Sequence, residues 1–311
     1  ISRFYRMWRL RHEGCSRADV IVEDRLGKRQ KWAISGAMLL ALAAAIPVGI
    51  YFLGLRVAPH LPHAAAAPAS VNAPAPPATS KATYVFAATD DPPGARSIDA
   101  HVSQIESIVP DWFRLPGSGC EVSETVDDAS RRWASRSDVR VVARVANLKN
   151  DSWAKGEAGA MLANADTRSC VITKIVKRAR ALGARGINVD LESLTAKDAA
   201  NLVAFMSELR GALATNELLS IDVTPDDPAY DLPRLGRIAD AVILMAYDEH
   251  EETSAPGPVA STEWFAAVVD RARAQMPADR LVAGIGSYCY DWQRRNSKTV
   301  HAEPLSFEAA M

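Results

Sequence analysis

Three polar side chains alternate with aliphatic ones in the stretch "ARGINVDLESL", residues 184–194: Asn188, Asp190 and Glu192. This period of two is that of a β-strand, in which successive side chains point to opposite faces. An amide and two carboxylates therefore share one face of the predicted strand. A carboxylic acid beside a carboxylate, shielded from water, has a raised pKa and can act as a general acid near neutral pH. The pair suits protonation of a glycosidic oxygen, with Glu192 as the acid.

The same polar face has a structural interpretation. Like charges on one strand face repel, and burying either carboxylate is costly without a partner. Such a face can meet solvent or pair with basic side chains, since structural ion pairs also place acids at strand ends. Spacing alone leaves both interpretations open.

A second polar cluster closes the run "ILMAYDEH", residues 243–250. Met245 and Tyr247 lie on one face of this predicted strand, and Asp248 follows at its tip. A tyrosine hydroxyl buried at such a place needs a polar partner. A core methionine and tyrosine are common, so this cluster indicates little without the first.

The elements that must position these residues alternate from residue 83 onward. Apolar runs predict strands at 83–88, 108–115, 139–146, 186–192, 219–224, 240–247 and 280–286. Amphipathic stretches predict helices at 97–107, 126–136, 167–182, 196–215, 229–237 and 262–275, and "TAKD" (195–198) resembles a capping box led by Thr195. This alternation predicts an α/β fold, a (β/α)8 TIM-type barrel whose active site lies at the carboxyl ends of the strands. An open doubly wound sheet of this many strands would be unusually wide.

No eighth strand is recognisable before the end of the sequence, where a helix is expected to begin in "EPLSFEAAM" (303–311). We therefore expect a barrel that is incomplete at its C-terminus, in a chain that is part of a longer protein.

Taken together, "GINVDLE" and "MAYD" resemble glycoside hydrolase family 18, the chitinase-like barrels, whose fourth and sixth strands carry D-G-x-D-x-D-x-E and M-x-Y-D. Two further stretches, "PGPVASTEWF" (256–265) and "LVAGIGSYCYDW" (281–292), are similar to the spore-germination, peptidoglycan-active branch. The resemblance runs from about residue 83 to the end. Arg185 and Asn188 depart from the family motif, where it has its first and middle aspartates.

The resemblance implies roles for individual residues. Glu192 is the acid/base, Asp190 orients the substrate acetamido group, and Tyr247 donates a hydrogen bond to the acetamido carbonyl. Asp248 binds sugar hydroxyls and Met245 forms the pocket floor. The implied mechanism is substrate-assisted retention, in which the N-acetyl oxygen of the sugar is the nucleophile.

Three other residues are candidates for substrate binding. Asn188 shares the inward face with the two carboxylates. Trp112 and Trp292 are possible sugar platforms, although either tryptophan can equally belong to the core.

The first 82 residues differ in character from the rest. Residues 1–31 hold nine Lys/Arg against four acids and predict a cytoplasmic basic tail. Trp32–Leu55 is free of charge and long enough, at 24 residues, to span a bilayer core. We expect an uncleaved membrane anchor there, with a cleaved signal peptide as the alternative. Residues 56–82 predict an Ala/Pro-rich linker, and 83–311 an extracytoplasmic (periplasmic or extracellular) barrel.

Other partners and cofactors have little support. The net charge of −1 gives no indication of nucleic-acid binding, and neither a GxGxxG nor a Walker motif indicates a nucleotide. No CxxC or Cys/His cluster occurs, so we expect neither metal nor cofactor. Outside the membrane at most one disulfide can form among Cys120, Cys170 and Cys289, and the sequence does not say which.

We therefore expect an anchored hydrolase of β-linked N-acetylglucosamine polymers: peptidoglycan, chitin-like oligomers or poly-N-acetylglucosamine. The alternatives are a non-catalytic glycan-binding barrel, which positions a polysaccharide for partner modules, and a membrane-tethered scaffold. Barrels of this kind also occur fused to polysaccharide deacetylase and glycosyltransferase modules. The polymer and linkage cut cannot be read, because variable loops set them.

Overall fold

The computed structural model describes residues 83–150, 152–295 and 298–306. The predicted tail (1–31), membrane anchor (Trp32–Leu55) and linker (56–82) lie outside these residues. Among the described residues, no helix combines the length and apolar character that crossing a bilayer requires.

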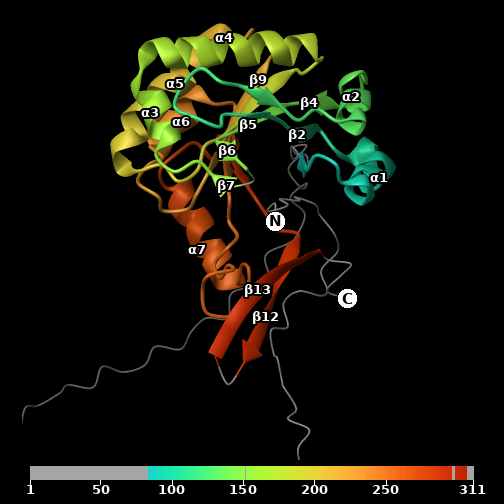
Figure 1. The fold of residues 1–311 in the computed structure, drawn as a ribbon, viewed down its shortest axis with the longest axis vertical. Helices are drawn as coiled ribbons and strands as arrows, with labels where there is room; N and C mark the ends of the chain where they lie inside the picture. Colours follow the sequence, from blue (N-terminus) through green and yellow to red (C-terminus); the bar gives the residue numbers. More distant parts are fainter. Residues whose placement is uncertain (1–82, 151, 296–297, 307–311) are drawn as a thin grey trace, which may run out of the picture. The chain divides into compact units, whose positions relative to one another are not determined.

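Seven parallel strands form the main sheet, in the order β1, β2, β5, β8, β9, β10, β11 (Figure 1). Their bounds are Tyr84–Ala87, Ser107–Arg114, Ala143–Ala146, Gly186–Asp190, Leu218–Val223, Ala241–Leu244 and Leu281–Ala283. Each strand pairs in parallel with the next strand in this order. Strand order that follows chain order without reversal is that of a (β/α) barrel wall, not of a doubly wound sheet. The predicted α/β class and parallel wall are confirmed.

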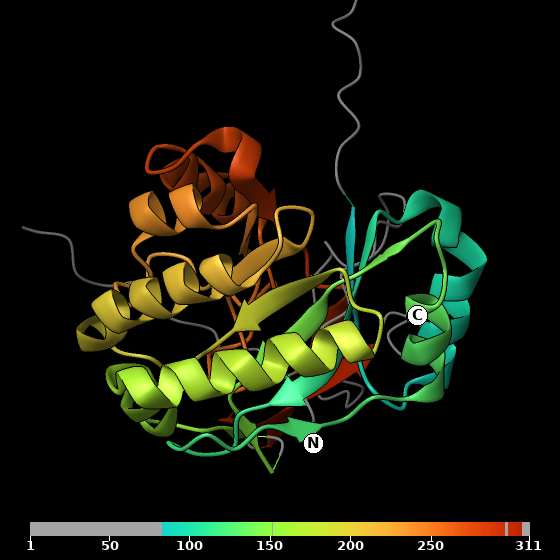
Figure 2. The ribbon, with the colours of Figure 1, turned by 90° about the horizontal axis from the view of Figure 1, so that it is seen from above.

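Helices connect these strands and cover one side of the wall. They are α1 (Pro92–His101), α2 (Asp128–Ala134), α3 (Glu157–Ala163), α4 (Ala165–Ala181), α5 (Ala199–Ala212), α6 (Leu232–Ile238) and α7 (Thr262–Arg273). Figure 2 shows α4 and α5 side by side along the sheet. Short 3-10 turns lie at Val102–Gln104, Ala196–Asp198 and Ala278–Arg280.

Local sequence explains where most of these helices begin. Side chains at their N-termini accept hydrogen bonds from backbone N–H groups of the first turn, at Asp91, Asp127, Asn164, Asp231 and Ser261. The predicted capping box is confirmed, because the Thr195 and Asp198 side chains each accept from the backbone N–H of the other residue.

The core has two parts. The larger cluster fills the layer between strands and helices, and includes Ile108, Val189, Leu202 and Phe205. The smaller cluster, which lies on the opposite side of the strands, consists of Tyr84, Phe86, Val109, Val142, Ala241 and Ile243. Because strand side chains alternate, the polar residues that follow in step with the smaller cluster also point into the barrel. Asp111, in step with Val109, and Arg144, in step with Val142, are two of them.

Two predicted strands that carry site residues end earlier in the structure than expected. β8 ends at Asp190 and β10 at Leu244, so Glu192 and Met245–Asp248 follow their strands rather than ending them. After β10 the backbone folds on itself, since the N–H groups of Ala246 and Tyr247 each bond a carbonyl two residues back.

The helix expected at 303–311 is wrong for its described part. Residues 303–306 belong to β13 (Lys298–Ser306), which pairs antiparallel with β12 (Tyr288–Arg295) in a separate sheet, red in Figure 1. A second small hairpin, β6 (Leu148–Lys149) with β7 (Ser152–Trp153), was also not predicted. Short strands β3 (Ser123–Glu124) and β4 (Arg140–Val141) pair with β2.

A disulfide joins Cys120, in the loop before β3, to Cys170 on α4, with 5.8 Å between the Cα atoms. It closes a loop over a sequence separation of 50 residues, and it settles which pair forms among the described cysteines.

Removing this bridge should destabilise the barrel. In the chain-entropy description, a loop of this length contributes about 4 kcal/mol to the free energy of unfolding. The variant Cys120→Ser/Cys170→Ser should therefore unfold at a lower urea concentration, with an unchanged or steeper slope because the unbridged denatured chain is more expanded. Reductant should shift the unmodified protein to the same midpoint and leave the variant unchanged. Equal midpoints for variant and parent under oxidising conditions would contradict the expectation.

Candidate active site

Inward-facing polar residues gather at the carboxyl end of the parallel strands. They come from four neighbouring strands: Asp111 from β2, Arg144 from β5, Asn188 and Asp190 from β8, and Asp222 from β9. All five are at most 8% exposed. Buried charges at this density require pairing, so their contacts define the site.

Asp190 is held by Arg144. The Arg144 Nε donates to Asp190 Oδ2 at 2.7 Å, and Nη2 donates to the same oxygen. Asp190 Oδ1 is buried and receives no hydrogen bond from any described residue. The carboxylate is therefore fixed through one oxygen, while the other remains open to a donor from a ligand.

Asn188 links Asp190's strand to β9. Its amide nitrogen donates to Asp222 Oδ1 at 2.8 Å and to the Ser220 hydroxyl at 3.1 Å. Burial, followed by the charge of Asp190, raises the pKa of Asp222 well above its usual range. Burial also raises the pKa of Asp190, but there the adjacent Arg144 guanidinium opposes the shift. The pKa of Asp222 is thus raised further than that of Asp190, so Asp190 is the more readily ionised member of the pair.

Glu192 is positioned through its backbone. Its N–H donates to the side-chain oxygen of Asn147, and its carbonyl accepts from the Asn147 amide nitrogen, both at 2.8 Å. Asn147 lies just beyond β5 and is fully buried. One side chain thus replaces the strand pairing that ends at Asp190, and the half-buried Glu192 side chain stands at the mouth of the barrel.

Tyr230, in the loop after β9, supports the same segment. Its hydroxyl donates to the carbonyl of Leu191 at 2.9 Å. Burial, followed by the charges of Glu192 and Asp190, raises the pKa of Tyr230, so the phenol stays protonated. It therefore adds no negative charge beside the two carboxylates.

The second predicted cluster follows β10. Met245 is 7% exposed and Tyr247 is half-buried. The Asp248 carboxylate accepts hydrogen bonds from the hydroxyls of Tyr288 and Tyr290 on β12. Since β10 is two strands from β8, the two clusters are separated by two strand spacings, about 10 Å, which leaves room for a sugar ring.

Non-glycine residues with left-handed backbones mark the turns beyond three consecutive wall strands. Ser193 follows β8 with φ 57°, Asp226 follows β9 with φ 58°, and Asp248 follows β10 with φ 63°. Such conformations persist where the surroundings determine them, commonly in functional loops.

The two predicted tryptophans have different positions. Trp112 is 1% exposed and packs in the larger core cluster, as the core interpretation had it. Trp292 is half-buried on β12 and ends a series of ring contacts that starts at Tyr247 and passes through Tyr288 and Tyr290. The centroid of the Trp292 ring lies 5.4 Å from the centroid of the Tyr290 ring.

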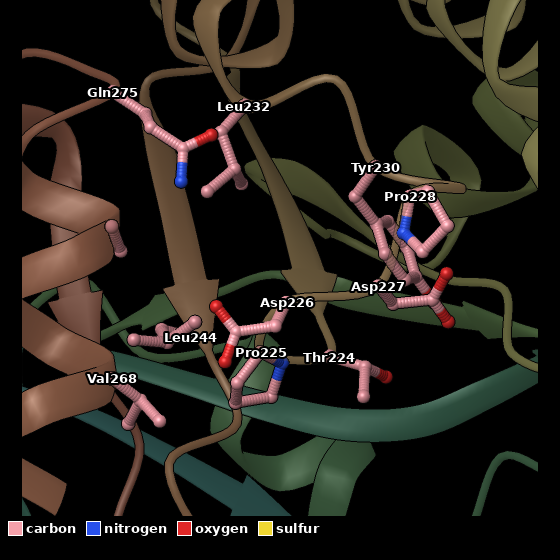
Figure 3. Close-up of a pocket in the computed structure, with 11 residues that line it drawn as sticks. Thr224, Pro225, Asp226, Asp227, Pro228, Tyr230, Leu232, Leu244, Val268 and Gln275 are labelled. Carbon is pink, nitrogen blue, oxygen red and sulfur yellow. The ribbon is translucent and has the colours of Figure 1, made fainter.

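A cavity of about 260 Å³ lies elsewhere, between the outer side of the wall and α7 (Figure 3). Its lining includes Pro225, Tyr230, Leu244 and Val268, and excludes every predicted site residue. In the described part of the chain, no three His, Cys, Asp or Glu side chains gather in a way that could hold a metal ion.

The arrangement of a barrel wall, a half-buried glutamate at its mouth and a buried carboxylate two residues earlier matches a known family. The model of the glycosyl hydrolases family 18 matches residues 80–310, which include all the described residues. The chain belongs to glycosyl hydrolase family 18. The predicted family and class of enzyme, a glycosidase, are therefore confirmed.

Family 18 relatives of known sequence include two proteins from Bacillus subtilis. The uncharacterized glycosylase YvbX is 24% identical over 226 residues, which cover 68% of this chain and 64% of the relative. A cortical fragment-lytic enzyme is 30% identical over 159 residues, which cover 48% of this chain and 37% of the relative. The chain spans less than two thirds of the length of either relative.

Solved family 18 structures show the same fold. A chitinase from Chromobacterium violaceum superposes with a TM-score of 0.65 at 26% identity, over 73% of this chain and 74% of the chitinase. The Bacillus cereus spore cortex-lytic enzyme SleL superposes with a TM-score of 0.66 at 20% identity, over 74% of this chain and 56% of SleL.

Five site residues were not predicted from sequence: Asp111, Arg144, Asn147, Asp222 and Tyr230. A signal existed for Arg144, since it interrupts the otherwise uncharged run "VVARVANL" at an inward position. A lone basic residue in a buried strand requires an acidic partner. Asp111 in "IVPDWF" and Asp222 in "LLSIDVT" interrupt uncharged runs in the same way, whereas Asn147 and Tyr230 carry no comparable local signal.

Proposed function

We propose that the barrel hydrolyses polymers of β-linked N-acetylglucosamine, such as peptidoglycan, chitin-like oligomers or poly-N-acetylglucosamine. The observation that carries the proposal is the open Oδ1 of Asp190, a buried acceptor beside Glu192 at the mouth of a family 18 barrel. An acetamido N–H is a donor of the right kind for this oxygen. Proteins similar to this chain include a cortical fragment-lytic enzyme and a chitinase, whose names point to the same class of polymer.

The chemistry has two steps. Glu192 donates its proton to the glycosidic oxygen, and the bond to the anomeric carbon breaks with its electron pair on that oxygen. The acetamido oxygen of the same sugar attacks the anomeric carbon and forms a cyclic oxazolinium ion. In the second step Glu192, now a carboxylate, takes a proton from water as the water oxygen attacks the anomeric carbon. The bond between that carbon and the acetamido oxygen breaks with its electron pair on the acetamido oxygen, which restores the N-acetyl group and gives net retention.

Asp190 stabilises the positive charge that develops on the reacting sugar. Its Oδ1 accepts from the acetamido N–H, which turns the acetamido oxygen toward the anomeric carbon and stabilises the cationic ring. Because Asp190 is fixed before substrate arrives, this stabilisation needs no reorganisation.

Other site residues hold the sugar. Tyr247 donates to the acetamido carbonyl, Met245 forms the pocket floor and Asp248 receives sugar hydroxyls. Asn188, whose side-chain oxygen receives no hydrogen bond from a described residue, is a further acceptor below Asp190. Trp292 and the tyrosines that lead to it provide ring faces for further sugars along β12.

Product analysis tests the function. The natural protein is incubated with defined N-acetylglucosamine oligomers and with purified peptidoglycan glycan strands, and products are identified by mass spectrometry. Shorter oligomers of unchanged N-acetylation support the proposal, and their anomeric form reports retention. Binding without cleavage of any of these glycans would instead favour a glycan-binding barrel.

We also propose that Trp32–Leu55 anchors the barrel outside the cytoplasm, with residues 1–31 inside. The uncharged length and the basic flank support this arrangement. The Cys120–Cys170 disulfide supports it independently, because such bonds persist in oxidising compartments.

Protease treatment of spheroplasts tests the topology. External protease should degrade the barrel and spare an epitope placed within residues 1–31, until detergent opens the membrane. A soluble, processed barrel would instead indicate a cleaved signal, and a protected barrel would contradict the proposed orientation.

A further inference from the structure

We propose that Arg144 is a positioning residue, which locks Asp190 in one orientation so that Oδ1 alone receives the substrate acetamido group. This inference rests on the proposed function, since it concerns how the same site prepares for its substrate.

All three nitrogen atoms of the Arg144 guanidinium contact carboxylates on the inner side of the wall. Nε and Nη2 both bond Asp190 Oδ2, while Nη1 lies 3.1 Å from Asp111 Oδ1 on the other neighbouring strand. The Trp153 ring lies over it, with 5.9 Å between the guanidinium carbon and the ring centroid. Arg144 is therefore fixed from three sides and cannot itself turn toward substrate.

The contacts of Arg144 determine which oxygen of Asp190 can accept a hydrogen bond from the substrate. A carboxylate with two equivalent oxygens can rotate and exchange them, but two donors on Oδ2 prevent rotation of Asp190. Asn188, on the same strand as Asp190, donates to Asp222 on the adjacent strand β9, and neither side chain gives Asp190 a hydrogen bond. Arg144 is thus the described residue that determines the Asp190 orientation.

The positive charge of Arg144 is needed at this position in addition to its hydrogen bonds. The titratable and polar groups that face Arg144 and Asp190 are Asp111 on β2, Asn188 on β8, Glu192 after β8, Asp222 on β9 and Tyr230 after β9. The positive groups are Arg114 on β2, whose Nη2 lies 3.4 Å from Asp111 Oδ2, and Arg144, which bonds Asp190. Burial opposes its charge, but Asp190 and Asp111 raise the pKa of Arg144, so it remains protonated across the working range.

Kinetics of two variants test the proposal. Arg144→Lys keeps the charge but not the fork that bonds Oδ2, and Arg144→Met removes both. We expect kcat on a defined N-acetylglucosamine oligomer to fall by about 10- to 100-fold in both, with a much smaller change in KM, because a misplaced group affects the transition state most. Arg168→Met is the matched control, since Arg168 is similarly buried at 9% but bonds Glu208 outside the barrel. The control should lower melting temperature and leave kcat unchanged.

The pH profile distinguishes positioning from a merely structural role. Turnover requires ionised Asp190, so activity falls as pH decreases through its pKa in the complex. Without the guanidinium, the remaining influences of burial and Asp111 raise this pKa. The acid limb of kcat should therefore move to higher pH in Arg144→Met, less in Arg144→Lys, and not at all in Arg168→Met.

A double-mutant cycle with Asp190→Asn completes the test. If Arg144 acts through Asp190, Arg144→Lys should lower kcat by less than about twofold in the Asp190→Asn background. Multiplicative losses, or Arg144 variants that match the Arg168 control in kcat and pH profile, would overturn the inference. If Arg144→Met does not fold, Arg144→Lys and its cycle decide the question. Failure of the proposed function itself shows separately, as absence of cleavage by the unmodified protein.

Discussion

Replacing Glu192 with glutamine should lower turnover of N-acetylglucosamine oligomers by at least ~100-fold, since the amide cannot supply the proton. The substitution keeps shape and most hydrogen bonding. The Asn147 clamp also remains, because it holds the backbone of residue 192 and not its side chain. Oligosaccharide affinity should therefore survive, as measured by calorimetry with an oligomer that the variant no longer cleaves.

Glu263→Gln is the control for this variant, since Glu263 is an exposed glutamate in the first turn of α7 and takes part in none of the site contacts described above. It should match the unmodified protein in turnover and melting temperature. An unchanged rate in Glu192→Gln would remove the acid role. If the unmodified protein also bound glycans without cutting them, the glycan-binding barrel would become the better interpretation.

Local sequence patterns predicted the wall and the two carboxylates for the same reason. The period of two in residues 186–192 is a local property, and it places Asp190 and Glu192 on the inner face whatever the neighbours are. Strand order followed from the regular alternation with helices, which permits few topologies. The family resemblance then assigned roles to residues whose positions were already restricted.

The partners of those residues could not be predicted, because they depend on register between strands. Arg144 reaches Asp190 across 46 residues of sequence, and only the pairing of β5 with β8 brings them together. Asn147 reaches Glu192 across 45 residues in the same way. The periodicity of residues within one strand carries no information about which residues of another strand they will contact.

The missed hairpin has a different cause. Tyr288, Tyr290 and Trp292 alternate as in a strand. However, the apolar run and the family resemblance of "LVAGIGSYCYDW" predicted a wall strand in the first half of this stretch only. In the structure the wall strand ends at Ala283, and the aromatic half forms β12. Trp292 therefore contacts other aromatic rings in a separate sheet and does not extend the wall.

Substrates without the N-acetyl group on the sugar at the cleaved bond should be refused, with kcat/KM reduced by at least ~1,000-fold. The proposed nucleophile is the acetamido oxygen of the substrate. The Asp190 carboxylate could replace it only through Oδ1, the oxygen that is proposed to accept from the acetamido N–H. Arg144 occupies the other oxygen. A de-N-acetylated sugar thus loses the nucleophile and leaves Oδ1 without its donor.

Oligomers with one defined deacetylated sugar measure this requirement. Deacetylation at the cleaved position should stop hydrolysis, while deacetylation at the far end of the chain should alter KM and leave cleavage of the other bonds intact. Normal cleavage beside a deacetylated sugar would mean that an enzyme carboxylate or water attacks directly, and would rule out substrate assistance.

A thiazoline analogue of the oxazolinium ion tests the same step from the side of the intermediate. It should inhibit competitively and bind more tightly than the corresponding sugar, because the site is proposed to fit the cyclised acetamido group. Its affinity should fall in Asp190→Asn, which weakens the contact with the cationic ring, and fall less in Glu192→Gln, whose missing proton the analogue does not need. Equal losses in both variants would contradict the role of Asp190 as the residue that stabilises the cationic ring of the intermediate.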